Sequence, residues 1–217
     1  GGLLFPGLSS DYGAMIRAAL ALHRATGESG YLERAVEWEA LLEQHHASPE
    51  TGGYYLTADD SGELIVRPNS TRDDAIPNPH AWMAQNLVRL ATLTGQYSYR
   101  DRADRLFAGV LPFAATNLFG HAALLAALDT RLRLAEIVVT GSRADVFAKA
   151  ALRESFLASA LLRAADASAL PEAHPARAKV AATAGEGAAF ICRGEVCSLP
   201  ITDPQELADA ISPPPAR

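Results

Sequence analysis

The chain has 217 residues, of which 49% are hydrophobic and 20% are charged, and its formal net charge is −6. This composition is typical of a globular protein with one sizeable core or two small ones. The negative charge and the lack of a Lys/Arg stripe argue against a nucleic-acid partner. No apolar run reaches the roughly 18 residues of a membrane span. We therefore expect a soluble protein with no nucleic-acid partner and no membrane.

The start of the chain and its cysteine count bear on origin and location. The first residues include neither a Met nor the basic segment of a signal peptide, which predicts a fragment of a longer protein. The two cysteines, Cys192 and Cys197, are too few for a disulfide-based scaffold. Because such low usage fits a reducing compartment, we expect a cytoplasmic location.

The first elements are two helices joined by a tight turn. Ser9 to Asp11 offers an N-cap, and apolar residues then recur at helical spacing from Met15 to Leu22. Gly27 is placed to end this helix with a positive φ. A second helix is predicted from about Tyr31 to His46.

The same pattern occurs a second time. The segment Leu22–Ala35 matches Leu90–Ala103 with six identities at a constant offset of 68 residues. Repeats at a fixed period are typical of stacked supersecondary units, here a helix, a Thr-Gly turn and a helix. The shared Tyr31 and Tyr99 are expected to pack the second helix of each hairpin onto the first.

The segment between the two hairpins carries short apolar runs and a polar loop. Residues Gly52–Thr57 and Glu63–Pro68 flank an Asp/Ser/Gly turn, which predicts a β-hairpin. The polar loop Asn69–Pro79 precedes a helix from about His80 to Leu93. A further helix, about Leu118 to Leu132, opens a third hairpin that is not completed.

The pattern changes near Leu134 to that of a small α/β module. The predicted strands are Glu136–Ser142, Leu157–Arg163, Ala188–Cys192 and Val196–Leu199, and the predicted helices are Ala144–Leu152 and Gln205–Ile211, the last capped by Thr202-Asp203-Pro204. We therefore expect a helical-hairpin domain over residues 1–133, a small α/β module over residues 134–212 and a Pro-rich tail over residues 213–217.

Three stretches link the chain to a known family. They are Asp11-Tyr12-Gly13; Gly52–Pro68 with Asp73–Asn78 leading into Met83–Leu87; and Cys192-x4-Cys197 followed by Pro200–Pro204. In these stretches the chain resembles the C-terminal part of the YyaL / spermatogenesis-associated protein 20 family. The resemblance implies a thioredoxin-like domain and further barrel hairpins N-terminal to this chain.

The resemblance also implies a fold. Members are expected to carry an α/α barrel similar to N-acylglucosamine 2-epimerases and six-hairpin glycosidases. The predicted fold class is therefore mainly α, a partial (α/α) barrel of helical hairpins with an inserted β-hairpin, plus a small C-terminal α/β module. One departure stands out: the family pattern Asp-Gly-Ala-x-Pro-Ser-Gly-Asn ends in Asn, whereas this chain has His80 there.

Polar side chains concentrate in the loop Asp73–His80. In an α/α barrel the loops at one mouth surround the pocket. Carboxylates there protonate a glycosidic oxygen or activate water when two of them face each other at about 5 to 9.5 Å. Since the adjacent Asp73 and Asp74 do not both reach one sugar atom, the predicted catalytic set pairs either of them with Asp11.

Tyr12, Asn78 and His80 complete the candidate site as substrate-binding residues. Each role has a structural alternative. Asn78 can cap the helix that follows, where the nearby carboxylates favour the helix dipole. Asp11 can be an N-terminal charge or cap of the first helix, with Tyr12 packing beside it. The sequence leaves both interpretations open.

Cys192 and Cys197 form the candidate redox site. Four residues separate them, whereas thioredoxin-type pairs are separated by two and open a helix. The alternatives are two small buried residues facing each other across a turn, a reversible disulfide, or two ligands of a metal site. No His or Cys spacing indicates a metal and no motif indicates a cofactor, so we predict neither.

Two functions are consistent with these features. The longer protein can be a carbohydrate-active enzyme, epimerase-like or glycosidase-like, that binds a small carbohydrate at the barrel mouth and uses carboxylates as acid and base. Alternatively, the hairpins are a non-catalytic scaffold that serves the N-terminal thioredoxin-like domain. The scaffold hypothesis predicts an exposed apolar surface where the missing hairpins dock.

Overall fold

The structure is a computed structural model that describes residues 7–62, 64–153, 159–183 and 187–211. It divides into two compact units, one of residues 1–91 and 96–131 and one of residues 92–95 and 132–217. The described chain is mainly helical and contains a small four-stranded sheet. Among its helices, none combines the length and apolar character that a membrane crossing requires.

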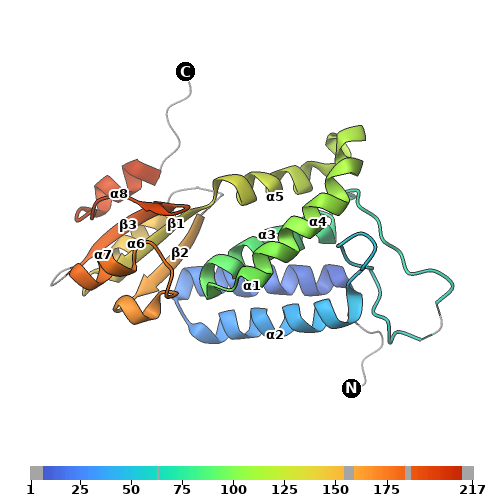
Figure 1. The fold of residues 1–217 in the computed structure, drawn as a ribbon, viewed down its shortest axis with the longest axis horizontal. Helices are drawn as coiled ribbons and strands as arrows, with labels where there is room; N and C mark the ends of the chain where they lie inside the picture. The colour runs from blue at the N-terminus through green and yellow to red at the C-terminus, as the bar shows by residue number, and fades with distance from the viewer. Residues whose placement is uncertain (1–6, 63, 154–158, 184–186, 212–217) are drawn as a thin grey trace. The chain divides into compact units, whose positions relative to one another are not determined.

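Helical hairpins build the first unit (Figure 1). Its elements are α1 (Ser9–Thr26), α2 (Ser29–His46), α3 (Pro79–Thr94), α4 (Tyr97–Thr116), the 3₁₀ turn η1 (Phe119–His121) and α5 (Ala122–Arg133). The turns of both hairpins contain the predicted glycines at positive φ, 80° at Gly27 and 71° at Gly95. Glycine adopts this conformation at no steric cost, so it ends one helix and lets the chain reverse. Both predicted hairpins are confirmed.

The two hairpins pack on each other in the register of the sequence repeat. Arg17 Nη1 on α1 donates to Gln85 Oε1 on α3 at 2.8 Å, a pair 68 residues apart. Asn86 Nδ2 donates to the carbonyl oxygen of Gly13 at 2.9 Å. The hairpin α1–α2 therefore covers one face of α3–α4. A closed α/α barrel stays a prediction.

The predicted β-hairpin between α2 and α3 is wrong for the residues that the structure describes. That segment forms one isolated bridge, Ala47 to Tyr54, and no strand. The guanidinium of Arg67 donates to the carbonyl oxygens of His45 (2.8 Å) and Thr57 (2.7 Å). The Arg67 side chain thus occupies the carbonyl oxygen of Thr57, an acceptor that a partner of the predicted first strand would use. Ile65 and its apolar neighbours stay exposed, because no layer covers the predicted second strand.

A mixed sheet forms the centre of the second unit. The strands β1 (Ala135–Thr140), β2 (Ser159–Ala164), β3 (Ala188–Arg193) and β4 (Val196–Cys197) lie in the order β2-β1-β3-β4. β1 pairs parallel with β2 and antiparallel with β3. All four predicted strands are confirmed within the described residues, although the start of the predicted Leu157–Arg163 strand lies outside them.

Helices bury both faces of this sheet (Figure 1). One face packs against α6 (Ala144–Arg153) and α8 (Pro204–Ile211), with Phe147 and Leu207 fully buried. The other packs against α7 (Arg177–Ala182) through Val180 and Phe190. α6 and α8 were predicted, and Asp203 Oδ1 accepts from Gln205 N at 2.9 Å at the start of α8. Six residues are too few for a periodic pattern, so α7 was missed.

Candidate functional site

Asn78 is the N-cap of α3. Its Oδ1 accepts from the backbone N–H of His80 at 2.8 Å. Its Nδ2 donates to the carbonyl oxygens of Ser70 (2.6 Å) and Arg72 (3.0 Å). The side chain is 4% exposed. The capping interpretation is confirmed, and the hydrogen bonds described for the amide group all go to backbone or side-chain groups of the protein itself.

His80 is a buried, neutral imidazole. Its Nε2 lies 3.0 Å from Tyr54 N, which can only donate, so Nε2 accepts. The proton is therefore on Nδ1, which donates to Asn78 Oδ1 at 2.8 Å. Burial lowers the pKa of His80 to about 4. A Cβ added at Gly53 would lie 2.5 Å from this ring, so glycine is required where the loop crosses it.

Asp73 joins the loop to α5. Its Oδ1 accepts from Asn78 N and its Oδ2 accepts from Ala123 N, both at 2.9 Å. The second bond satisfies an otherwise unpaired N–H at the start of α5, where a negative charge is favoured by the helix dipole. Asp74 is exposed. The loop thus holds Asp73, Asn78 and His80 in one hydrogen-bonded network.

Asp11 and Tyr12 lie in the first turn of α1. Asp11 Oδ2 accepts from Leu8 N at 2.9 Å, so the carboxylate stabilises the helix start from within the first turn and Leu8 stands at the N-cap position. The ring of Tyr12 meets the ring of His46 edge-on, with centroids 5.6 Å apart. Among the contacts described for residues 7–62 and 64–153, none joins Asp11 or Tyr12 to the Asp73 network.

A buried ion pair links the two hairpins. Glu39 on α2 is 1% exposed, and its carboxylate oxygens lie 2.9 Å from Arg102 Nη1 and Nη2 on α4. Burial raises the pKa of Glu39 to about 7, against the opposing effect of the Arg102 charge. Such shifts are frequent at catalytic sites and in structural ion pairs alike. The sequence signal for Glu39 was its helical spacing with the buried Ala35 and Leu42.

An open groove runs between α1 and α2. It has a volume of about 470 Å³. α1 contributes Met15, Ala18 and Leu22, which share one helix face at i, i+3 and i+7, and α2 contributes Tyr31, Arg34 and Trp38 in the same way. Met15 is 50% exposed and Leu22 is 44% exposed. Helical spacing predicted this face of α1, and the scaffold hypothesis expected an exposed apolar surface without indicating which helices carry it.

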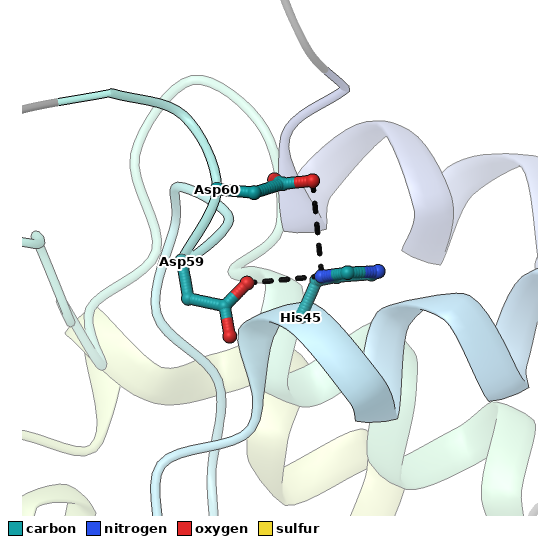
Figure 2. A group of neighbouring side chains, drawn as sticks. All are labelled: His45, Asp59 and Asp60. Atoms are coloured by element: carbon teal, nitrogen blue, oxygen red, sulfur yellow. Dashed lines mark hydrogen bonds and ion pairs between the residues drawn. The ribbon is translucent and has the colours of Figure 1, made fainter.

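One group of side chains has the composition of a cation site. His45 Nδ1 lies 2.9 Å from Asp59 Oδ1 and 3.9 Å from Asp60 Oδ2 (Figure 2). Imidazole and carboxylate groups together suit a divalent transition metal. The hydrogen bond to His45 lowers the pKa of Asp59. Both carboxylates are exposed and Arg67 donates to the backbone of His45, so the group has the character of a surface ion pair.

Cys192 and Cys197 face each other on β3 and β4, with Cα atoms 4.0 Å apart, and form a disulfide. The predicted facing arrangement is confirmed. Of the alternatives that the sequence left open, the structure contains the disulfide. Cys192 is buried and Cys197 is half-buried. Lys179 Nζ donates to the carbonyl oxygen of Cys197 at 2.7 Å, which fixes the end of the short strand.

Known proteins are similar to the chain along almost its whole length. Spermatogenesis-associated protein 20 of Homo sapiens is 28% identical over 215 residues, that of Rattus norvegicus 28% over 209, and that of Mus musculus 27% over 214. These matches cover 95%, 93% and 93% of this chain. The chain is a relative of spermatogenesis-associated protein 20. No protein-family model matches the sequence.

The relation to spermatogenesis-associated protein 20 covers a limited part of that protein. The chain spans 27% of the human protein and 26% of the rat and mouse proteins. Roughly three quarters of each relative therefore lies outside the match. What the whole protein does is a separate question from what these two units contribute.

Proposed function

We propose that this chain is a non-catalytic scaffold within a longer protein of the spermatogenesis-associated protein 20 family, and that the groove between α1 and α2 is a docking surface. The open groove carries this proposal. Met15 and Leu22, both on α1, are about half exposed. Covering the exposed half of one such side chain contributes about 0.8–1.5 kcal/mol, half of the value for full burial, so an apolar partner gains affinity from the groove.

The polar loop supports a scaffold over a catalyst. Glycoside chemistry requires two carboxylates facing each other across a sugar. Both oxygens of Asp73 accept backbone N–H groups, and Asn78 and His80 are buried in the same network. The groove is lined by other residues, none of them among the proposed catalytic Asp11, Asp73 and Asp74. The carbohydrate-active enzyme and the thioredoxin-like partner stay predictions.

The docking role is tested by placing a charge in the groove. Leu22→Asp is compared with Val146→Asp, a control on α6 with a similar exposed fraction, 44% against 47%. In the 217-residue chain both substitutions should change the Tm little. In the longest polypeptide that the gene encodes, Leu22→Asp should lower the Tm by several degrees and Val146→Asp should not. Equal effects in the longer polypeptide would contradict the proposal.

The catalytic alternative has its own test. Asp11→Asn combined with Asp74→Asn leaves the two helix-stabilising bonds of Asp73 in place. If the longer polypeptide converts sugars, and this variant keeps its Tm but loses that activity, the scaffold proposal is wrong. The scaffold proposal expects no sugar conversion that depends on these carboxylates.

A further inference from the structure

The sequence repeat relates the open groove to a buried face. Adding the repeat offset of 68 to the number of each groove residue gives its counterpart on α3 or α4. The corresponding residues are Met83, Asn86, Leu90, Tyr99, Arg102 and Leu106. Five of the six are buried, and the Arg102 side chain is 17% exposed. The same helix face is thus covered in the second hairpin and open in the first.

The first hairpin is what covers this face of the second. Asn86 Nδ2 donates to the carbonyl oxygen of Gly13. Met83 Cγ lies 3.9 Å from the position that a Cβ on Gly13 would occupy. Arg102 reaches Glu39 on α2. Contacts from α1 and α2 therefore bury the face that holds these three residues of α3–α4.

Matching residues of the two hairpins differ in how far they are exposed. Met15 is 50% exposed and its counterpart Met83 is 0% exposed, and Leu22 is 44% exposed and its counterpart Leu90 is 0% exposed. The residue types are the same in both pairs. At these two positions the open face of α1 thus carries the same residue types as the buried face of α3.

The charged position of the groove follows the same relation. Arg102 pairs with Glu39 and, at 3.3 Å, with Glu43, which both lie on the preceding hairpin. Its counterpart Arg34 pairs at 2.8 Å with Glu37, one turn away on its own helix, and its side chain is 59% exposed. Exposed i, i+3 ion pairs contribute little, so Arg34 can exchange this partner at small cost.

Resting on the docking role proposed above, we infer that the groove seats a helical hairpin that precedes α1 in a longer polypeptide. This hairpin packs on α1–α2 as α1–α2 packs on α3–α4. Its second helix presents a carboxylate to Arg34, in the place that Glu39 takes opposite Arg102. The relatives have ample length for such a hairpin, because roughly three quarters of each lies outside the match.

Thiol labelling measures whether the groove is covered. Leu22→Cys and the control Val146→Cys are labelled with a maleimide without reductant, so that the Cys192–Cys197 disulfide stays intact, and peptide mass spectrometry reads each site. Leu22→Cys should react at least tenfold more slowly in the longest polypeptide that the gene encodes than in the 217-residue chain. Val146→Cys should react alike in both.

Charge variants test the partner of Arg34. In the longer polypeptide, Arg34→Glu should restore fast labelling of Leu22→Cys, because it opposes the partner carboxylate, and Arg34→Lys should keep most of the protection. Arg100→Glu, an exposed position on α4, is the matched control and should leave the protection unchanged. Protection that Arg34→Glu does not weaken would overturn the assigned ion pair.

The remaining outcomes separate this inference from the docking role. If Leu22→Cys is protected in the 217-residue chain at high concentration and sedimentation gives a dimer, the occupant is a second copy; the inference is then wrong and the docking role stands. A gene that encodes no helical hairpin before α1 also overturns the inference. Equal labelling of Leu22→Cys in both polypeptides overturns the inference and the docking role together.

Discussion

Glu39 and Arg102, 63 residues apart in the sequence, form an ion pair with both oxygens of the carboxylate 2.9 Å from guanidinium nitrogens. The Glu39 side chain is 2% exposed. A pair so deeply buried stabilises the folded state little more than apolar residues in the same place would. Removing one partner is costly, because the other charge then stays buried without compensation. The pair thus fixes how α4 meets α2, and its members are best tested one at a time.

Removing the arginine alone should be costly. At pH 8, Arg102→Met should lower the free energy of unfolding by about 3–5 kcal/mol, because Glu39 then stays buried without its partner. The double variant Glu39→Met with Arg102→Met should lie much closer to the wild type. Urea denaturation of the three proteins measures both values. A change below about 0.5 kcal/mol in the single variant would show that the pair does not hold the hairpins together.

The raised pKa of Glu39 should make stability depend on pH. The folded-state pKa is about 7 and the ordinary value is 4.5, so the folded state binds a proton more tightly than the unfolded state. The stabilising contribution is complete below pH 4.5 and is lost as the pH rises to about 7. Its size is on the order of 3 kcal/mol. Glu39→Gln should remove this part of the pH dependence in urea unfolding between pH 4.5 and 8, whereas an unchanged profile would contradict it.

A methyl group at Gly53 should be poorly tolerated. The ring of His80 is held by two hydrogen bonds, so it does not move aside for a Cβ only 2.5 Å away. Gly53→Ala should lower the free energy of unfolding by about 1–3 kcal/mol. Gly30→Ala is the control, because a Cβ there meets nothing within 4 Å and Gly30 is the second residue of α2. It should stabilise the protein by about 0.5–1 kcal/mol in the same thermal or urea assay.

The two adjacent aspartates should differ in their effect on stability. Asp73→Ala removes acceptors from Asn78 N and Ala123 N, and we expect a loss of about 1–3 kcal/mol. Asp74 is exposed, so Asp74→Ala should stay within about 0.5 kcal/mol of the wild type. Urea denaturation of both variants and the wild type measures the two changes in the free energy of unfolding. Equal effects of the two substitutions would remove the structural role assigned to Asp73.

Local chemistry made the helices predictable. Gly27 and Gly95 end their helices because the positive φ of those turns is a property of the residue itself. The Asn78 cap involves atoms two residues apart, so the sequence contained it. The repeat, and with it the pairing of helices into hairpins, was visible for the same reason.

The β-hairpin prediction failed because a strand depends on what lies beside it. The run Leu64 to Val66 has strand-like residues, but no described layer covers it and Arg67 occupies the carbonyl oxygen of Thr57 in the predicted partner strand. The candidate site shows the same limit. The sequence placed Asp73, Asn78 and His80 together, yet their distant partners Tyr54 and Ala123 became known only from the fold.

By itself the sequence determined the helical hairpins, their offset and the small α/β module, because capping, turn conformation and apolar periodicity act over a few residues. The tertiary structure alone decided which faces are covered. It buried Met83 and left Met15 open, paired Glu39 with Arg102, and turned Asp73 toward α5. Burial and pairing depend on which segments meet across tens of residues, and no local rule specifies that.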